Sequence, residues 1–113
     1  MDIIEKSTAI HYQWGDNCDG WHLVKSKQLS VIQERMLAGC CESNHYHQNA
    51  EQFFYIISGL ATMKLKNKTL TLKAGEGVHI EAGTAHQLCN ESEHELNFIV
   101  TSAPPSHGDK QEI

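Results

Sequence analysis

Two histidines near the middle of the chain have the type and spacing of metal ligands. His45 and His47 are one residue apart in the stretch HYHQNAEQ, which also contains the acid Glu51 and the amide Gln52. On a β-strand, alternate side chains point to the same face, so both imidazoles would lie on one side of a sheet. Because carboxylate and amide oxygens are also metal donors, the question is which residue completes the site.

A second histidine-containing segment supports this interpretation. Gly39 is followed by five residues and then by the histidine pair, and Gly75, Gly83, His86 and Asn90 recur later at fixed spacing; Glu81 lies between those two later glycines. These two segments resemble the two motifs of the cupin superfamily, which usually has proline at the position of Glu81. The resemblance covers roughly residues 28–101 and is closest to small single-domain cupins of a sugar-phosphate-isomerase-like group.

The resemblance implies a metal bound by His45, His47, His86 and a residue that follows the histidine pair. The fourth ligand is found by counting to Gly59, which ends the strand. Glu51 leaves seven residues before Gly59, whereas Gln52 leaves the six that the motif requires. A shift of one residue turns a side chain to the other face. We therefore expect Gln52 inside the barrel and Glu51 outside, with Gln52 either a ligand or a polar interior residue.

This ligand set indicates one divalent transition metal. Three imidazoles and an amide are neutral, so they leave the full charge on the cation and make it a stronger Lewis acid. Zinc, iron, nickel, manganese and copper all accept such donors. We expect open positions for water or for a small molecule held in the barrel.

Two functions are compatible with such a site. One is an enzyme acting on a small oxygen-rich metabolite as an isomerase, a lyase or a dioxygenase. The other is a module that binds a metal or a small molecule without turnover, because the sequence shows no acid–base pair. Glu34, on the alternating segment of residues 30–36, is the candidate general base.

The elements that would position these residues have the periodicity of strands. Apolar and polar side chains alternate over residues 60–66 and again over 69–73, which predicts a hairpin with its turn near Asn67. Further strands are expected at residues 21–24, 29–37, 52–57, 78–80, 86–89 and 95–101. Many short strands separated by turn residues indicate an all-β fold, and the resemblance implies the cupin jelly-roll barrel, a double-stranded β-helix. Only residues 1–6 suggest a helix.

The length of 113 residues fits a single cupin domain over residues 1–113. We expect its barrel core at about residues 21–101. Residues 102–113 form a tail with both prolines of the chain, which we expect to be dispensable for folding. Exposed sheet edges and aromatic residues such as Trp21 favour a homodimer.

The charge of the chain and the character of its apolar segments argue against nucleic-acid-binding, secreted and membrane proteins. The net charge is −5, the lysines are scattered and Arg35 is the only arginine, so we expect no nucleic-acid partner. No signal peptide and no apolar run of membrane-spanning length is found, which predicts a cytoplasmic protein with no membrane partner. In that compartment the cysteines would be free thiols; they are Cys18, Cys40, Cys41 and Cys89.

The remaining histidines are not expected to bind metal. Their surroundings indicate surface, loop or pocket-lining roles. They are His11, His22, His79, His94 and the tail residue His107.

Overall fold

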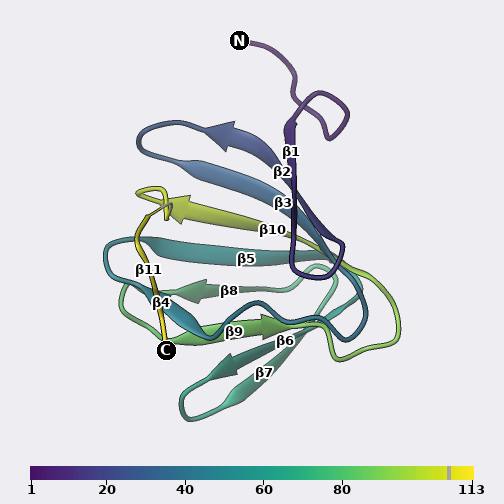
Figure 1. Ribbon diagram of the computed structural model, residues 1–113, viewed down its shortest axis with the longest axis vertical. Helices are drawn as coiled ribbons and strands as arrows, with labels where there is room; N and C mark the ends of the chain where they lie inside the picture. Colours follow the sequence, from purple (N-terminus) through teal and green to yellow (C-terminus); the bar gives the residue numbers. More distant parts are fainter. Residues whose placement is uncertain (107) are drawn as a thin grey trace.

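The computed structural model describes residues 1–106 and 108–113 and consists of two facing antiparallel sheets (Figure 1). The described residues form eleven strands and no helix. The strands are β1 (Ile10–Trp14), β2 (Cys18–Lys25), β3 (Ser30–Met36), β4 (His45–His47), β5 (Glu51–Ser58), β6 (Leu60–Leu65), β7 (Thr69–Lys73), β8 (Gly77–Ile80), β9 (His86–Cys89), β10 (Leu96–Ala103) and β11 (Lys110–Glu112).

The chain passes repeatedly from one sheet to the other. The six-stranded sheet has the order β1-β2-β3-β10-β5-β8, and the five-stranded sheet has the order β11-β4-β9-β6-β7. Neighbours in each sheet are therefore mostly distant in sequence, which is the jelly-roll arrangement and confirms the predicted all-β class.

Alternating burial directs one face of each sheet into the core. In β5, Gln52, Phe54 and Ile56 are buried, whereas Phe53 and Tyr55 between them are exposed. The same two-residue period runs through β10, whose inward residues pack on those of β5. The closed core between the sheets consists of Cys18, Met36, Phe54, Ile56, Ala61, Met63, Leu72, Ile80, Leu88, Leu96, Phe98 and Val100.

Gly59 fixes where β5 ends. Its φ is +93°, a conformation that L side chains rarely adopt, and a Cβ there would lie 2.6 Å from the carbonyl oxygen of Glu95. No other residue fits this turn without a shift of the backbone. The strand that precedes Gly59 therefore has a fixed register, and so do the directions of its side chains.

The predicted hairpin is confirmed, because β6 and β7 pair from Leu60↔Lys73 to Lys64↔Thr69. The expected helix over residues 1–6 is wrong: this segment leads into a turn in which the Thr8 and Ala9 amides bond the carbonyl of Glu5. Two strands, β1 and β11, lie outside the expected core of residues 21–101. No described helix is long and apolar enough to cross a membrane.

Candidate metal centre

Strand β4 places two imidazoles on the inner face of the five-stranded sheet. His45 and His47 are buried, and Tyr46 between them is half-buried and points the other way. β4 lies between β9 and β11, and His45 is paired with His86 across the β4–β9 ladder. The pairing brings the histidine of the second motif beside those of the first.

The three histidines form a compact cluster. One ring nitrogen from each of His45, His47 and His86 lies within 4.8 Å of the others. The ring centroids are 4.9 Å apart for His45 and His47 and 4.4 Å apart for His45 and His86. Such a group can hold one ion.

Backbone carbonyls fix the orientation of two of the rings. His45 Nδ1 lies 2.6 Å from the Ser43 carbonyl oxygen, and His86 Nδ1 lies 2.9 Å from the Thr84 carbonyl oxygen. A carbonyl can only accept, so each Nδ1 carries the proton and each Nε2 keeps a free lone pair. A carbonyl partner on the remote nitrogen is the usual support of a metal-binding histidine.

The cluster is electrically neutral at pH 7. Burial lowers the pKa of His45 to about 4, with the His86 and Lys110 charges acting in the same direction. Burial also lowers the pKa values of His47 and His86. Metal binding requires unprotonated imidazole, so the cluster is ready to bind a cation without first losing protons.

Gln52, not Glu51, faces this cluster, as the count to Gly59 predicts. Gln52 is 6% exposed, whereas Glu51 lies outside and pairs with His79 Nε2 at 2.8 Å. The Gln52 Nε2 group donates to Ser102 Oγ at 2.9 Å. Gln52 Oε1 is buried and has no hydrogen-bond partner among the described residues.

The unpaired polar atoms of the site fit a cation. His47 Nδ1, His86 Nε2 and Gln52 Oε1 are all buried without a partner in the described part of the chain. Buried polar atoms without a partner are uncommon and costly, and a metal ion would satisfy the unprotonated ones. Asn90 of the second motif has a structural role instead, because its amide donates to the Met36 and His94 carbonyls and holds the loop after β9.

A cavity of about 180 Å³ opens beside the cluster. Glu34 and Tyr12 lie in its wall, and the Tyr12 hydroxyl donates to Glu34 Oε2 at 2.7 Å. Burial raises the pKa of Glu34 to about 7, against the lowering effect of this hydrogen bond and of the Lys110 ammonium. Burial likewise raises the pKa of Glu42, also in the wall, to about 8, and the Glu34 charge adds to the shift.

The contact between Tyr12 and Glu34 crosses an intervening strand. Tyr12 is paired with Gly20, and Gly20 is paired with Glu34, so the three residues form a row across β1, β2 and β3. A Cβ on Gly20 would overlap the Tyr12 ring. The absence of a side chain at Gly20 lets the ring lie over β2 and reach the carboxylate.

Several residues of the site are not identifiable from the sequence. Tyr12 comes from a strand outside the predicted core, and Ser102 and Lys110 come from the predicted tail. The alternation of Tyr12 and Trp14 in IHYQW was the available signal for β1. Lys110 and Ser102 carried no recognisable signal, because they reach the cavity only through the pairing of β11 with β4 and of β10 with β5.

Strand β11, within the tail that the sequence predicts to be dispensable for folding, pairs with β4. Lys110 pairs with His47 and Glu112 pairs with His45. The Asp109 carboxylate accepts hydrogen bonds of 2.9 Å from the backbone amides of Asn49 and Ala50. The tail thus supplies one of the two neighbours of β4. His107 lies outside the described residues.

The expectation of four free thiols is wrong for one pair. Cys41 and Cys89 form a disulfide, while Cys18 and Cys40 are free. Cys41 and Cys89 face each other across an isolated antiparallel bridge, so the bond joins the segment before β4 to the end of β9. It ties together the two chain segments that carry the histidines.

The other histidines that the structure describes lie outside the cluster. His11 Nε2 is 2.7 Å from Asp19 Oδ1, His79 pairs with Glu51, and His94 is exposed. His22 lies on β2, where its ring is 5.1 Å from that of Tyr12. Phe54 lies in the cavity wall, and its ring is 5.8 Å from that of His86.

Comparison with known proteins agrees with this fold. The family profile described as a cupin domain matches residues 34–102. An uncharacterized protein of Methanocaldococcus jannaschii is 32% identical over 91 residues, which are 80% of this chain and 73% of that protein.

Two solved structures share the fold. KdgF from Halomonas sp. has a TM-score of 0.85 and 14% identity, covering 95% of this chain and 98% of its own. The polyketide cyclase RemF of Streptomyces resistomycificus has a TM-score of 0.81 and 14% identity, covering 100% and 85%.

Proposed function

The chain belongs to the cupin family, and from this membership and the buried histidine cluster we propose that it is a metal-dependent enzyme. Its reaction would be proton transfer on a small oxygen-bearing molecule, as in an isomerase or a lyase. The observation that carries the proposal is a set of buried nitrogen and oxygen atoms that have no hydrogen-bond partner among the described residues and could bind a metal. They lie beside the cavity that is lined by the Tyr12–Glu34 pair.

The metal ligands would be His45, His47, His86 and Gln52. Nitrogen and amide-oxygen donors suit zinc, iron, nickel, manganese or copper. A divalent cation held there would polarise a substrate oxygen and so acidify the neighbouring C–H bond. Because these ligands are neutral, they would not reduce the charge with which the cation polarises the substrate oxygen.

Glu34 would carry the proton. Its carboxylate lies in the cavity wall, and a pKa of about 7 lets it both accept and return a proton near neutral pH. The Tyr12 hydroxyl holds Oε2, so that the other carboxylate oxygen is available to a substrate. Glu42, in the same wall, has its Oε1 bonded to the Leu88 amide at 3.0 Å and is therefore a positioning group rather than the base.

The rival function is a cupin that binds a ligand without turnover. The half-buried Tyr12–Glu34 pair favours the enzyme, because a module that only binds a metal does not need a carboxylate tuned for proton exchange. RemF is named a polyketide cyclase, which says only that this fold can host an enzyme.

Exchange of substrate hydrogen with solvent tests the proposal without knowledge of the product. Protein reconstituted with each of the five metals would be incubated in D₂O with a panel of hydroxyketones, hydroxyaldehydes and 2-oxo acids, and loss of the C–H signal followed by proton NMR. We expect exchange with at least one compound, and about one metal ion per chain by elemental analysis.

Matched variants separate the roles. Glu34→Gln should keep the metal and lower exchange by about a hundredfold or more, the usual contribution of a general base. His45→Ala with His47→Ala should lose the metal, and Glu51→Gln should change neither readout. Metal binding with no exchange for any compound would favour the binding module, and no metal at all would refute the site.

We also propose that the protein forms a homodimer. Trp21, the expected contact, is half-covered by His11 and by the Lys6 ammonium, which lies 4.3 Å from its ring. The outer face of β5 is a better candidate, because Phe53, Tyr55 and Ile57 are more than 40% exposed there.

A further inference from the structure

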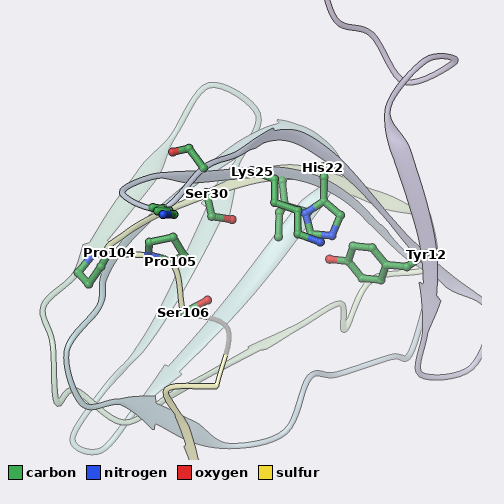
Figure 2. Close-up of a pocket in the computed structure, with 10 residues that line it drawn as sticks. Tyr12, His22, Lys25, Ser30, Pro104, Pro105 and Ser106 are labelled. Carbon is green, nitrogen blue, oxygen red and sulfur yellow. The ribbon is translucent and has the colours of Figure 1, made fainter.

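A second and larger cavity lies next to the candidate metal centre. Its volume is about 700 Å³. It lies between the first three strands and the segment that follows β10. The described residues that line it are Tyr12, His22, Lys25, Ser26, Lys27, Ser30, Ile32, Pro104, Pro105 and Ser106. Figure 2 shows Tyr12, His22 and Lys25 toward one end of this cavity and Pro104, Pro105 and Ser106 toward the other.

The two cavities share a wall. Tyr12, Ile32 and Ser106 line both the large cavity and the one beside the histidines. The hydroxyl of Tyr12 reaches Glu34 on the metal side, while the same residue lines the large cavity. The two cavities are therefore adjacent.

The lining combines an apolar body with positive charge. Ile32, Pro104, Pro105 and the Tyr12 ring offer flat apolar surface, and Lys25 and Lys27 offer two ammonium groups. None of the described lining residues is acidic, although the chain has a net charge of −5. Within the described part of the chain, neither lysine takes part in an ion pair.

The two lysines are held by an ordered turn. Ser26 N donates to the Leu29 carbonyl at 3.0 Å, and Ser26 Oγ accepts from the Leu29 amide at 3.1 Å. The turn between β2 and β3 thus has a defined shape, with Lys25 before it and Lys27 within it. Less conformational entropy is lost on binding when the recognising groups start from an ordered turn.

Strand register gives the backbone separation between Lys25 and the proposed base, Glu34. Lys25 is paired with Ser30, and Glu34 lies four residues further along β3. At a rise of about 3.3 Å per residue, the two positions are roughly 13 Å apart.

We propose that the large cavity binds an anionic group of the substrate. The substrate class is a molecule with a carboxylate or phosphate at Lys25 and Lys27 and an apolar part against Ile32 and the two prolines. That this ligand is a substrate rests on the proposed function, whereas the binding of an anion does not.

Three probes of one shape test the site: 2-naphthoate, 2-naphthyl phosphate and the neutral 2-naphthamide. Each would be titrated into the full-length protein supplied with zinc, with amide chemical shifts followed by NMR and metal content measured on the same sample. We expect both anions to shift the Tyr12, Ile32 and Ser106 signals, and the amide to bind about tenfold more weakly or less. The tighter of the two anions identifies the natural group.

The lysines are tested against a matched pair. Lys25→Gln with Lys27→Gln should bring the affinity for the anions down to that for the amide. Lys68→Gln with Lys73→Gln, two exposed lysines of the β6–β7 hairpin, removes the same charge and should change the anion affinity less than twofold.

Three results would overturn the proposal. The neutral amide could bind as tightly as the anions, or both double variants could lose the same anion affinity. The third result is that the chemical-shift changes are confined to the outer face of β5. The metal measurement keeps the two proposals apart. A protein that binds the anions through Lys25 and Lys27 but holds no metal would refute the proposed function and leave this site standing.

Discussion

The Tyr12 hydroxyl donates a 2.7 Å hydrogen bond to Glu34 Oε2 across the bare backbone of Gly20. Burial raises the pKa of Glu34, and this bond opposes the shift because it stabilises the charged carboxylate. The pair therefore fixes both where the carboxylate lies and at what pH it can accept a proton.

Removing the hydroxyl should shift the pH dependence of exchange. A base works when it is deprotonated, so the rate rises with pH through its pKa. Tyr12→Phe removes a bond to the charged form, which raises the Glu34 pKa above about 7 and moves the rise to higher pH. Deuterium exchange measured from pH 5 to 9 checks the direction.

Gly20→Ala provides an independent variant, since its Cβ would displace the Tyr12 ring. It should shift the profile in the same direction as Tyr12→Phe. An unchanged profile in both variants would show that the hydrogen bond does not tune the base.

Gln52 should set the metal preference of the site. Gln52→Glu would add a carboxylate among the histidines and shift affinity toward harder ions such as manganese. Glu51→Gln should have little effect, because Glu51 is exposed and pairs with His79 on the outside. Competitive titrations with zinc and manganese test both variants. If only Glu51→Gln lost the metal, Glu51 rather than Gln52 would face the histidines and the register of β5 would differ by one residue.

The disulfide should contribute measurably to stability. It closes a loop of 48 residues, for which the chain-entropy model gives up to about 4 kcal/mol. Reducing the protein should lower its free energy of unfolding by an amount of that order in urea titrations. Cys41→Ser should match the reduced protein, and reductant should have no further effect on this variant. A reductant effect that persists would place the bond elsewhere.

Asp109 should couple the tail to pH. The Asn49 and Ala50 amides lower the pKa of its carboxyl below the ordinary 3.8. A lowered pKa means that the stabilisation is present above pH 3.8 and is lost as the pH falls through the lower folded value. Hydrogen exchange of the β4 amides, corrected for its intrinsic pH dependence, should therefore quicken in acid. Asp109→Ala should quicken it at pH 7, whereas Glu112→Gln should not.

Deleting residues 106–113 should lower the melting temperature by about 5 °C or more, because β4 loses a hydrogen-bonded neighbour. A change of only a degree or two would support the expectation of a dispensable tail.

The homodimer is tested at the outer face of β5. The chain has a mass of 12.7 kDa, so light scattering should give twice that value. Phe53→Lys with Tyr55→Lys should yield monomer, whereas Lys68→Glu on the hairpin should leave the dimer intact. A monomeric parent protein would contradict the proposal.

The alternation of apolar and polar residues predicted those parts of the fold that depend on neighbouring residues in the sequence. The alternation in residues 60–73 predicts the β6–β7 hairpin, and the count from Gln52 to Gly59 predicts which side chain faces inward. Gly59 makes that count valid, because its left-handed backbone and the nearby Glu95 carbonyl exclude other residues.

The rest depends on pairings between distant segments. Lys110 reaches the cavity only because β11 pairs with β4, and nothing in KQE itself indicates that partner. The Cys41–Cys89 bond follows from a bridge between residues 48 positions apart. Tyr12 reaches Glu34 only because Gly20 lies between them in a three-strand row, a relationship that a single strand's pattern does not contain.

The position of β4 between β9 and β11 has a consequence for synthesis on the ribosome. His45 and His47 emerge first, His86 follows later, and β11 comes after β9. Until β9 has emerged, β4 lacks the neighbour that carries His86, so the nascent protein holds at most a two-histidine fragment of the candidate site. The three-histidine cluster can therefore form only after His86 has left the exit tunnel.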